Sequence, residues 1–318
     1  MSPANLAAEM GASPDSEKAA PQAPPIPPLV RARIVFVRAF LMGWARLFSM
    51  SGLYKLGQFF GTLEYLVDYH RRRRVHAALR ALFKDEHPAS WRRRMTWRYF
   101  MRIRCDKMFY AIMDRIPRGK LMNRIKMHGR EHLDGALAGG RGVYVALCHF
   151  GAHYVAGLMT ALLGYRLAGV RDPKESHVRR YIQNKYRATF PEVAEMKVFH
   201  ATNFPREIFR QFKDNKIIAS LLDVDRRRGE TTKTRPVQFF GATREFLIGP
   251  IQIALHCGAP TLQGFIESRK NFYYRLIVSP PLIEPGNVTD EEAAITAVMQ
   301  HYADGVERFA REHPDHLM

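Results

Sequence analysis

The chain has few cysteines and lacks several motifs on which metal and nucleotide sites depend. Its 318 residues include three cysteines, Cys105, Cys148 and Cys257, which are widely spaced and odd in number. This spacing excludes a disulfide framework and a paired-cysteine zinc site, and it favours a reducing compartment. Neither GxGxxG nor GxxxxGK[ST] occurs, so the sequence has no glycine-rich phosphate loop. We expect neither a metal nor a cofactor.

Long uncharged apolar runs are also absent. Residues 29–83 are strongly apolar, but basic side chains interrupt every window of about twenty residues, which argues against a transmembrane span. Arginines alternate there with large apolar residues at helical spacing, as in a helix that lies in a membrane interface. A core helix of a soluble protein shows the same spacing, so both interpretations stay open. The residues concerned are Phe36, Phe40, Trp44, Leu47 and Phe48.

Acidic residues are scarce in the same region. Lys and Arg outnumber Asp and Glu by 49 to 30 over the whole chain, and residues 31–100 alone carry a net charge of +11. Each basic residue near an anionic leaflet contributes about 1 kcal/mol to membrane binding. Nucleic acid attracts the same charges, but the sequence has no RNA-recognition signature and no evident helix-turn-helix. We therefore expect an anionic membrane surface and no nucleic acid as partner, and keep a basic nucleic-acid-binding protein as an alternative.

Composition divides the chain into three parts. Residues 1–28 are rich in Ala and Pro without apolar periodicity, which predicts a disordered tail, and they lack the pattern of a secretory signal peptide. Residues 29–100 are predicted to form basic amphipathic helices associated with a membrane. Residues 101–318 are predicted to form an α/β domain.

In that third part, short apolar runs alternate with amphipathic segments. We predict strands in "GVYVALCH", "MKVFHA", "KIIASLLDVD", "APTLQGFI" and "YYRLIVSPPL", and helices in "EIFRQFKD", "IGPIQIALHCG" and "DEEAAITAVMQHYADGVERFAREH". Alternation of this kind is typical of an α/β fold with a central sheet flanked by helices.

One histidine stands where a predicted strand ends and a glycine turn begins. His149 closes the apolar run that starts at Val143, and helix-like sequence follows it. Taken alone, a histidine at a strand end is commonly a hydrogen-bonded structural residue. Cys148 is its neighbour, but adjacent residues of a strand point to opposite faces, so we interpret Cys148 as a packed thiol rather than a nucleophile.

Four stretches, in this order, resemble the lipid A biosynthesis acyltransferase family, the late lauroyl and myristoyl transferases, within the wider lysophospholipid acyltransferase-like group. They are "LGQFFGTLEYLVDYHRRRRVHAALRALF", "HFGAHY" at 149–154, "DVD" at 223–225 with "VQFFG" at 237–241, and "IGPIQIALHCGAPTLQGFI" at 248–266. Together they span most of residues 50–315.

The resemblance implies an acyltransferase-like mixed sheet and an enzyme at the cytoplasmic face of the bacterial inner membrane. Such an enzyme moves a fatty acyl chain from a thioester of acyl carrier protein or coenzyme A. The acceptor is a hydroxyl of a phosphorylated glycolipid, such as a lipid A precursor, or of a phospholipid.

The resemblance also assigns a role to the strand-end histidine. In the family this residue opens an HxxxxE or HxxxxD motif, in which the acid orients the imidazole and the imidazole acts as general base. Here His149 opens the motif, but Tyr154 stands at the acid's position and supplies no charge at neutral pH. Three alternatives follow: Asp223 or Glu175 orients the histidine, the histidine works more slowly without an acid, or the domain binds lipid without catalysis.

Further candidate residues follow from the same resemblance. His149 and Asp223 are the catalytic candidates, and Tyr154 is assigned to the substrate side. Arg171, in "VRDP", matches a family arginine near the acceptor, where a guanidinium can bind phosphate with two hydrogen bonds. Asp225 follows Asp223 at the end of a predicted strand, where α/β folds place functional groups, and we assign it to the substrate side.

The stretch that follows Asp225 is rich in basic residues. The stretch "RRRGETTKTRPVQFFGATRE" at 226–245 has no core pattern before Val237, which predicts a basic loop over the site. Phe239, Phe240 and Gly241 then resemble a family "FFG" in which the glycine permits a turn and the aromatic rings line an acyl groove. We predict Phe240 and Gly241 on the substrate side, with core packing of the two phenylalanines as an equal alternative.

Overall fold

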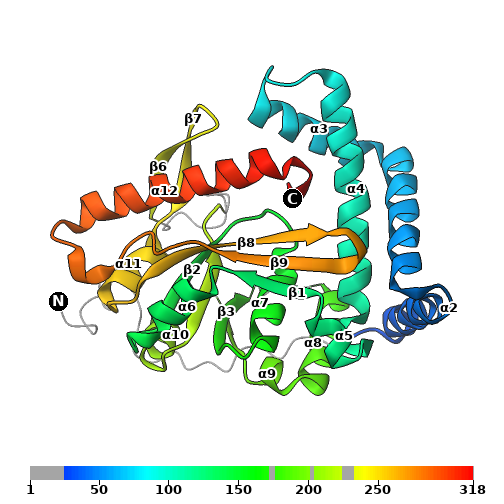
Figure 1. The fold of residues 1–318 in the computed structure, drawn as a ribbon, viewed down its shortest axis with the longest axis horizontal. Coiled ribbons are helices and arrows are strands. Elements are labelled where there is room, and N and C mark those ends of the chain that lie inside the picture. Colours follow the sequence, from blue (N-terminus) through cyan, green and yellow to red (C-terminus); the bar gives the residue numbers. More distant parts are fainter. Residues whose placement is uncertain (1–24, 172–175, 201–203, 224–232, 318) are drawn as a thin grey trace.

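A computed structural model describes residues 25–171, 176–200, 204–223 and 233–317. The predicted tail therefore lies almost wholly outside the described residues. Three helices precede the sheet and form one side of the molecule (Figure 1): α2 (Pro28–Val67), α3 (Tyr69–Phe83) and α4 (Ala89–Ile112). The predicted domain boundary after residue 100 falls inside α4, and the division into domains stays a prediction.

Helix α2 is bent and packs tightly on α4. Ser49 has φ of 66° and ψ of 173°, so the helical path changes direction there. Beyond the bend, two glycines one helical turn apart face α4. A Cβ atom on Gly57 would lie 2.7 Å from Sγ of Cys105, and one on Gly61 would lie 2.5 Å from Cα of Met101. The absence of side chains at these two positions lets the helix backbones approach closely.

The central sheet has seven strands and is mixed. The strands are β1 (Ile125–His128), β2 (Val143–Leu147), β3 (Leu167–Arg171), β4 (Lys197–His200), β5 (Ile217–Leu221), β8 (Thr261–Arg269) and β9 (Tyr273–Val278), in the spatial order β1-β9-β8-β2-β5-β3-β4. All neighbouring pairs run parallel except β8 and β9, which are antiparallel. The five predicted strands and the predicted fold class are confirmed. The sequence analysis did not predict β1 or β3.

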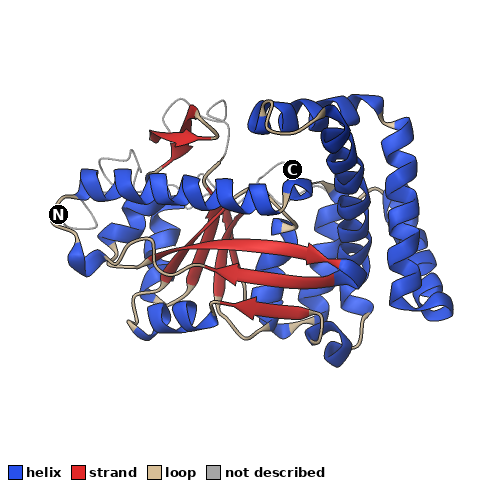
Figure 2. Cartoon of the chain, turned by 45° about the horizontal axis from the view of Figure 1, so that its top comes forward, coloured by secondary structure: helices blue, strands red, loops and turns tan. Residues whose placement is uncertain are grey.

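Helices cover both faces of the sheet (Figure 2). They are α5 (Arg118–Met122), α6 (Arg130–Ala138), α7 (His153–Leu162), α8 (His177–Thr189), α9 (Pro191–Ala194), α10 (Phe204–Lys213), α11 (Gly249–His256) and α12 (Glu291–Glu312). The three predicted helices correspond to α10, α11 and α12. Strand β2 shows why both faces are covered: Val143 and Val145 join one hydrophobic cluster, and Tyr144 and Ala146 join the other.

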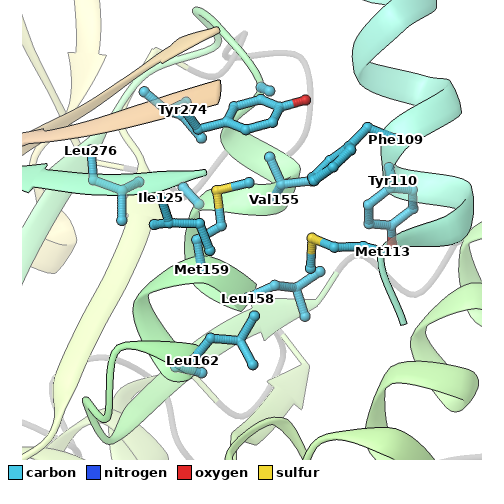
Figure 3. Packing of buried hydrophobic residues seen from close by; sticks show 14 of the residues in the cluster. Phe109, Tyr110, Met113, Ile125, Val155, Leu158, Met159, Leu162, Tyr274 and Leu276 are labelled. Atoms are coloured by element: carbon cyan, nitrogen blue, oxygen red, sulfur yellow. The ribbon is translucent and has the colours of Figure 1, made fainter. Parts of the chain in front are cut away.

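The first cluster ties the N-terminal helices to the sheet. Figure 3 shows Phe109 of α4, and Met113 directly after α4, packed against α7, represented by Val155 and Met159. Leu53 of α2 belongs to the same cluster. The helices in front of the sheet therefore share a core with it.

The predicted basic loop over residues 226–245 is wrong for its second half. Thr234–Phe239 form β6 and Ala242–Leu247 form β7, which pair antiparallel as a hairpin. Phe240 and Gly241 occupy its two-residue turn with φ of 51° and 63°, the backbone that this tight turn requires. Alternation in β6 was the missed signal, because Val237 and Phe239 are buried while Pro236 and Gln238 are exposed.

Helix α2 leaves much of its apolar surface uncovered. Four of the five residues singled out in the sequence are exposed: Phe36 72%, Phe40 44%, Leu47 79% and Phe48 54%. This excludes the core-helix interpretation for them. By length and composition α2 is also able to cross a membrane, and 17% of its most apolar window is buried. The sequence had argued against a span, and this helix is weak evidence for association with a membrane.

Candidate functional site

The site forms where two neighbouring parallel strands end. Strands β2 and β5 pair in register, with Leu147 opposite Leu221. His149 and Asp223 each lie two residues past these positions, so the chain directions and the register bring them to the same edge of the sheet. The sequence predicted both residues at strand ends, and the structure brings them together.

Asp223 contacts His149 through both carboxylate oxygens. Oδ2 accepts the main-chain N–H of His149 at 2.8 Å, and Oδ1 lies 2.9 Å from Nδ1 of the ring. Because the carboxylate is an acceptor, Nδ1 carries the proton of the neutral imidazole and Nε2 keeps its lone pair. The His149 side chain is 40% exposed and that of Asp223 is 15% exposed. The arrangement is an acid-oriented histidine whose ring is open to a reactant.

The turn after His149 depends on a glycine. Gly151 has φ of +67°, and a Cβ atom there would lie 2.2 Å from the carbonyl oxygen of Ile266. The main-chain N–H of Gly151 donates to the carbonyl oxygen of His316 at 2.7 Å. Helix α7 begins two residues later, with no side-chain cap at Ala152. The histidine therefore sits on a turn held from both sides by main chain.

Tyr154 is placed away from the role of the missing acid. Its ring packs edge-on against Tyr110, and burial, followed by the charge of Asp106, raises the pKa of its hydroxyl well above the usual value. The hydroxyl has no hydrogen-bond partner among the described residues. Asp223, not Tyr154, contacts Nδ1 of His149. Tyr154 is a neutral residue that packs in the core beside the site.

His153 lies between these residues. Its ring stands edge-on to His149 with ring centroids 5.3 Å apart. Burial, then the neighbouring charges of His149 and Arg179, lowers the pKa of His153 to about 4. The imidazole of His153 is thus neutral near pH 7, and its Nδ1 has no partner among the described residues. Sequence analysis gave this residue no role.

The cysteine beside the histidine is packed. Cys148 is 3% exposed, and burial followed by the charge of Asp223 raises the pKa of its thiol well above the usual value. A thiol of this kind supplies no thiolate nucleophile near neutral pH. The packed-thiol interpretation therefore agrees with the structure.

The remaining predicted residues are distributed unevenly. Phe240 is 5% exposed and packs edge-on against Phe83 of α3, and the carbonyl oxygen of Gly241 lies 3.4 Å from Nζ of Lys84. Both belong to the hairpin turn rather than to the histidine turn. Arg171 ends β3, but its side chain lies outside what the structure describes, and Asp225 and Glu175 lie outside the described residues.

Two further features bear on the site. Within the described ranges, no group of three or more His, Cys, Asp or Glu side chains lies close enough to hold a metal ion.

The segment after α12, which sequence analysis did not single out, contacts the histidine turn through His316 and Leu317. Its only sequence signal was the apolar Leu317 beyond a helix-ending Pro314.

The fold and the site together define a class of α/β protein with an acid-oriented histidine at the strand-to-helix turn. Such a histidine can remove a proton from a hydroxyl group that binds at that edge of the sheet. The particular family follows from the sequence: residues 28–318 match the family model described as bacterial lipid A biosynthesis acyltransferase. The chain belongs to that family, and it is an acyltransferase that acts on lipid substrates.

Other comparisons add less. Among solved structures, the chain is similar to the 1-acyl-sn-glycerophosphate (LPA) acyltransferase PlsC from Thermotoga maritima, with 15% sequence identity and a TM-score of 0.36. The similarity covers 80% of this chain and 97% of that one. A comparison with curated protein sequences gave no match.

Proposed function

We propose that the protein moves a fatty acyl chain from a thioester donor to a hydroxyl of a phosphorylated glycolipid such as a lipid A precursor. The observation that carries the proposal is the pair of contacts between His149 and Asp223, 2.8 and 2.9 Å long, in a chain of the lipid A acyltransferase family. Donors are acyl carrier protein and acyl-coenzyme A, which share the thioester and a phosphopantetheine arm.

The reaction needs one base and one orienting acid. Nε2 of His149 removes the proton of the acceptor hydroxyl as its oxygen attacks the thioester carbonyl. Asp223 holds Nδ1 and stabilises the imidazolium that forms. The tetrahedral intermediate then expels the thiolate, which takes the proton from Nε2, and the new ester bond remains on the lipid. The histidine ends the cycle neutral, so no other reactant is required.

The acceptor is a membrane lipid, and the N-terminal helices suit a membrane surface. Beyond the bend in α2, the apolar side chains of Phe59, Leu63, Leu66 and Val67 are exposed at helical spacing. Arg73 and Arg74 follow on α3 and are exposed as well. An apolar stripe flanked by cations is typical of helices bound to anionic bilayers. We place the protein at the cytoplasmic face of the bacterial inner membrane, where thioester donors are found.

A second candidate function is lipid binding without catalysis. The specific observation in its favour is Tyr154 at the position of the family acid. The contact from Asp223 weakens it, because that carboxylate provides the orientation that the motif acid would otherwise supply.

Acyl transfer by the full chain separates the two functions. The purified protein is given acyl carrier protein or coenzyme A thioesters and a lipid A precursor in anionic vesicles, and lipid products are measured by mass spectrometry. We expect His149→Ala to lower the rate by about 10³-fold, since a general base contributes 10²- to 10⁴-fold. His128→Ala, an exposed histidine on β1, is the matched control. Equal, measurable rates for wild type and His149→Ala would exclude His149 as the general base, whereas no product from the wild type would favour the non-catalytic function.

A further inference from the structure

The turn that carries His149 is paired with a segment far along the chain. The main-chain N–H of Gly151 donates to the carbonyl oxygen of His316 at 2.7 Å, and Phe150 forms an antiparallel bridge with Leu317. These contacts involve the residues directly after His149. The position of the turn therefore depends on the position of residues 315–317, which we call the 315–317 segment.

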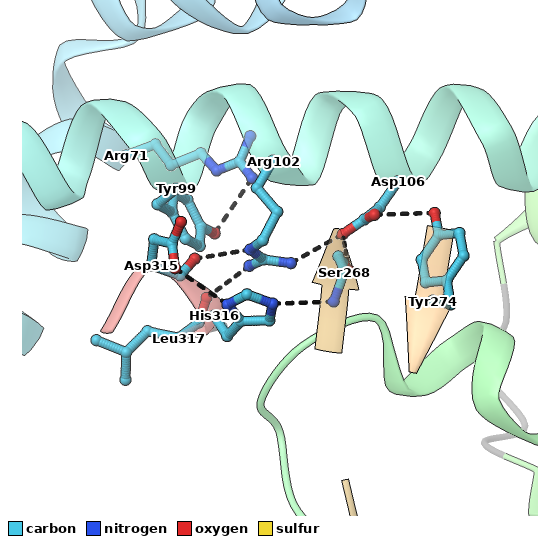
Figure 4. A network of polar contacts seen from close by, with 9 residues as sticks. All are labelled: Arg71, Tyr99, Arg102, Asp106, Ser268, Tyr274, Asp315, His316 and Leu317. Atoms are coloured by element: carbon cyan, nitrogen blue, oxygen red, sulfur yellow. Dashed lines mark hydrogen bonds and ion pairs between the residues drawn. The ribbon is translucent and has the colours of Figure 1, made fainter. Parts of the chain in front are cut away.

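A buried arginine fixes the 315–317 segment (Figure 4). Arg102 of α4 donates from Nε to the carbonyl oxygen of Asp315 at 2.7 Å and from Nη2 to that of Leu317 at 3.4 Å. Its Nη1 donates to Oδ2 of Asp106 at 2.9 Å. One planar guanidinium thus joins two carbonyls of the segment to a carboxylate of α4, which suits the fixed fork geometry of arginine.

The sheet holds the other side of the network. The hydroxyls of Ser268 on β8 and Tyr274 on β9 each donate to Asp106 at 2.9 Å. Nε2 of His316 accepts the main-chain N–H of Ser268 at 3.0 Å, and its Nδ1 lies 3.0 Å from Oδ1 of Asp315. Burial, then the charge of Arg102, lowers the pKa of His316 to about 4, so the ring is neutral and holds the tautomer that these two contacts need.

Burial makes the network sensitive to change. Arg102, Asp106 and His316 are 7%, 3% and 4% exposed. Buried ion pairs often contribute little net stability compared with well-packed apolar residues, whereas the loss of one partner strongly destabilises the fold. Both other hydrogen bonds of Arg102 reach the 315–317 segment, and those of Asp106 come from β8 and β9. A buried pair that joins this segment to the sheet suits a geometric role better than a purely stabilising one.

We propose that Arg102 is a positioning residue for the reaction: it holds the 315–317 segment, and through the contacts of that segment with Phe150 and Gly151 it fixes the turn that orients His149. This inference rests on the proposed function of His149. Arg102 touches neither His149 nor Asp223 in any contact of the described residues, and its effect on the reaction is indirect.

The main test replaces the buried pair by apolar residues. In the Arg102→Met/Asp106→Leu variant the charges are removed together, so no uncompensated charge is left. We expect kcat to fall by about 10- to 100-fold with a change of less than about threefold in KM for the donor, because small displacements of a catalytic group mainly slow the chemical step. Hydrogen exchange at the main-chain N–H of Gly151 should become at least about tenfold faster.

A matched control and a second variant keep the test decisive. Arg38 and Asp114 form another buried Arg–Asp pair, 2.5 Å apart with side chains 5% and 3% exposed, and Arg38→Met/Asp114→Leu should leave Gly151 exchange and kcat within about threefold of wild type. Leu317→Ala loosens the 315–317 segment without touching any charge and should speed Gly151 exchange. Leu317→Ala replaces the Arg102→Met/Asp106→Leu variant in the test if that double variant does not fold.

Two outcomes overturn the proposal. The first is a wild-type rate of hydrogen exchange at the main-chain N–H of Gly151 in a folded Arg102→Met/Asp106→Leu or Leu317→Ala variant. This rate would show that the 315–317 segment does not hold the turn. Faster exchange with unchanged kcat shows that the turn does not position His149. If the wild type itself transfers no acyl group, the proposed function fails, whereas the exchange measurement still decides whether Arg102 holds the turn.

Discussion

At the scale of single residues, one histidine receives its orientation from a neighbouring strand instead of from the helix that follows it. The HxxxxE or HxxxxD motif that the sequence resembles has its acid at the position of Tyr154, in the first turn of α7. Asp223 approaches from the end of β5 and engages both Nδ1 and the main chain of His149. In the proposed mechanism, this carboxylate fixes the tautomer and supports the charge that forms on the ring during proton transfer.

Replacement of that carboxylate by an amide tests its role. We expect Asp223→Asn to lower kcat by about 10²- to 10⁴-fold, because the amide keeps the shape but removes the negative charge and allows the wrong tautomer. KM for the acyl donor should change little. Steady-state kinetics with acyl-thioester donors measure both values. A loss smaller than threefold would mean that Asp223 only supports the turn.

Tyr154 gives the complementary prediction. Its hydroxyl is buried without a partner among the described residues, so we expect Tyr154→Phe to leave the free energy of unfolding unchanged or to raise it by up to about 1 kcal/mol. Tyr154→Glu places a carboxylate in the same apolar surroundings, close to the charge of Asp106. It should destabilise the protein by about 2–4 kcal/mol and should not raise kcat. A higher kcat in Tyr154→Glu would show that the missing motif acid limits the rate.

At the scale of elements, the packing of α2 on α4 determines where the exposed apolar stripe lies. Gly57 and Gly61 face α4, so α2 comes close on that side, while Phe59, Leu63, Leu66 and Val67 are exposed. Beyond the bend at Ser49, the helix therefore has an apolar surface that no other described part of the chain covers, which the proposed function assigns to the membrane.

Alanine substitutions at two glycines of α2 separate the effect of close packing on stability from the effect of helix propensity. A Cβ atom at Gly61 meets main-chain atoms of Phe100 and Met101 within 2.8 Å, whereas one at Gly43 meets nothing within 4 Å. We expect Gly61→Ala to lower the free energy of unfolding by about 1–3 kcal/mol and Gly43→Ala to raise it by about 0.5–1 kcal/mol. Urea unfolding followed by circular dichroism measures both. Equal effects of the two substitutions would contradict the tight α2–α4 contact.

At the scale of the whole molecule, charge and apolar surface are gathered at the N-terminal helices and the catalytic candidates at the edge of the sheet. The net charge of the chain is +19, and residues 31–100 hold more than half of it. One part of the molecule is therefore suited to an anionic surface, while the acid-oriented histidine belongs to the α/β part.

Flotation with vesicles tests this division. We expect Arg73→Ser/Arg74→Ser to weaken binding to anionic vesicles by about 10- to 30-fold, since each basic residue near the surface contributes about 1 kcal/mol. Binding should also weaken as salt rises. Lys126→Ser/Arg141→Ser removes the same charge from exposed positions in the α/β part and should have a smaller effect. Vesicle binding that does not depend on the anionic lipid content, together with binding to RNA, would support the nucleic-acid alternative.

Stability should depend on pH through two buried histidines. The pKa values of His153 and His316 are each lowered to about 4, chiefly by burial. Since the unfolded chain binds these protons near pH 6.5, each residue contributes stability that is present above pH 6.5 and lost as the pH falls toward 4, up to about 3 kcal/mol each. Thermal unfolding from pH 7.5 to 4.5 should show a falling Tm. His153→Leu should make that fall shallower, and an unchanged slope would remove His153 from the explanation.

The sequence by itself determined the α/β class, the five main strands, His149 at a strand end and the family. These features depend on local alternation of apolar residues and on short motifs, which nearby residues define. It did not reveal the β6–β7 hairpin, because basic residues hid a short alternating pattern.

Only the tertiary structure decided which acid meets His149. Asp223 is 74 residues away in the chain, and its contact follows from the pairing of β2 with β5 in register. The same holds for the contact of Gly151 with His316 and for the burial of Tyr154. Strand order and helix packing result from the sum of many long-range contacts, and no local pattern of residues encodes them.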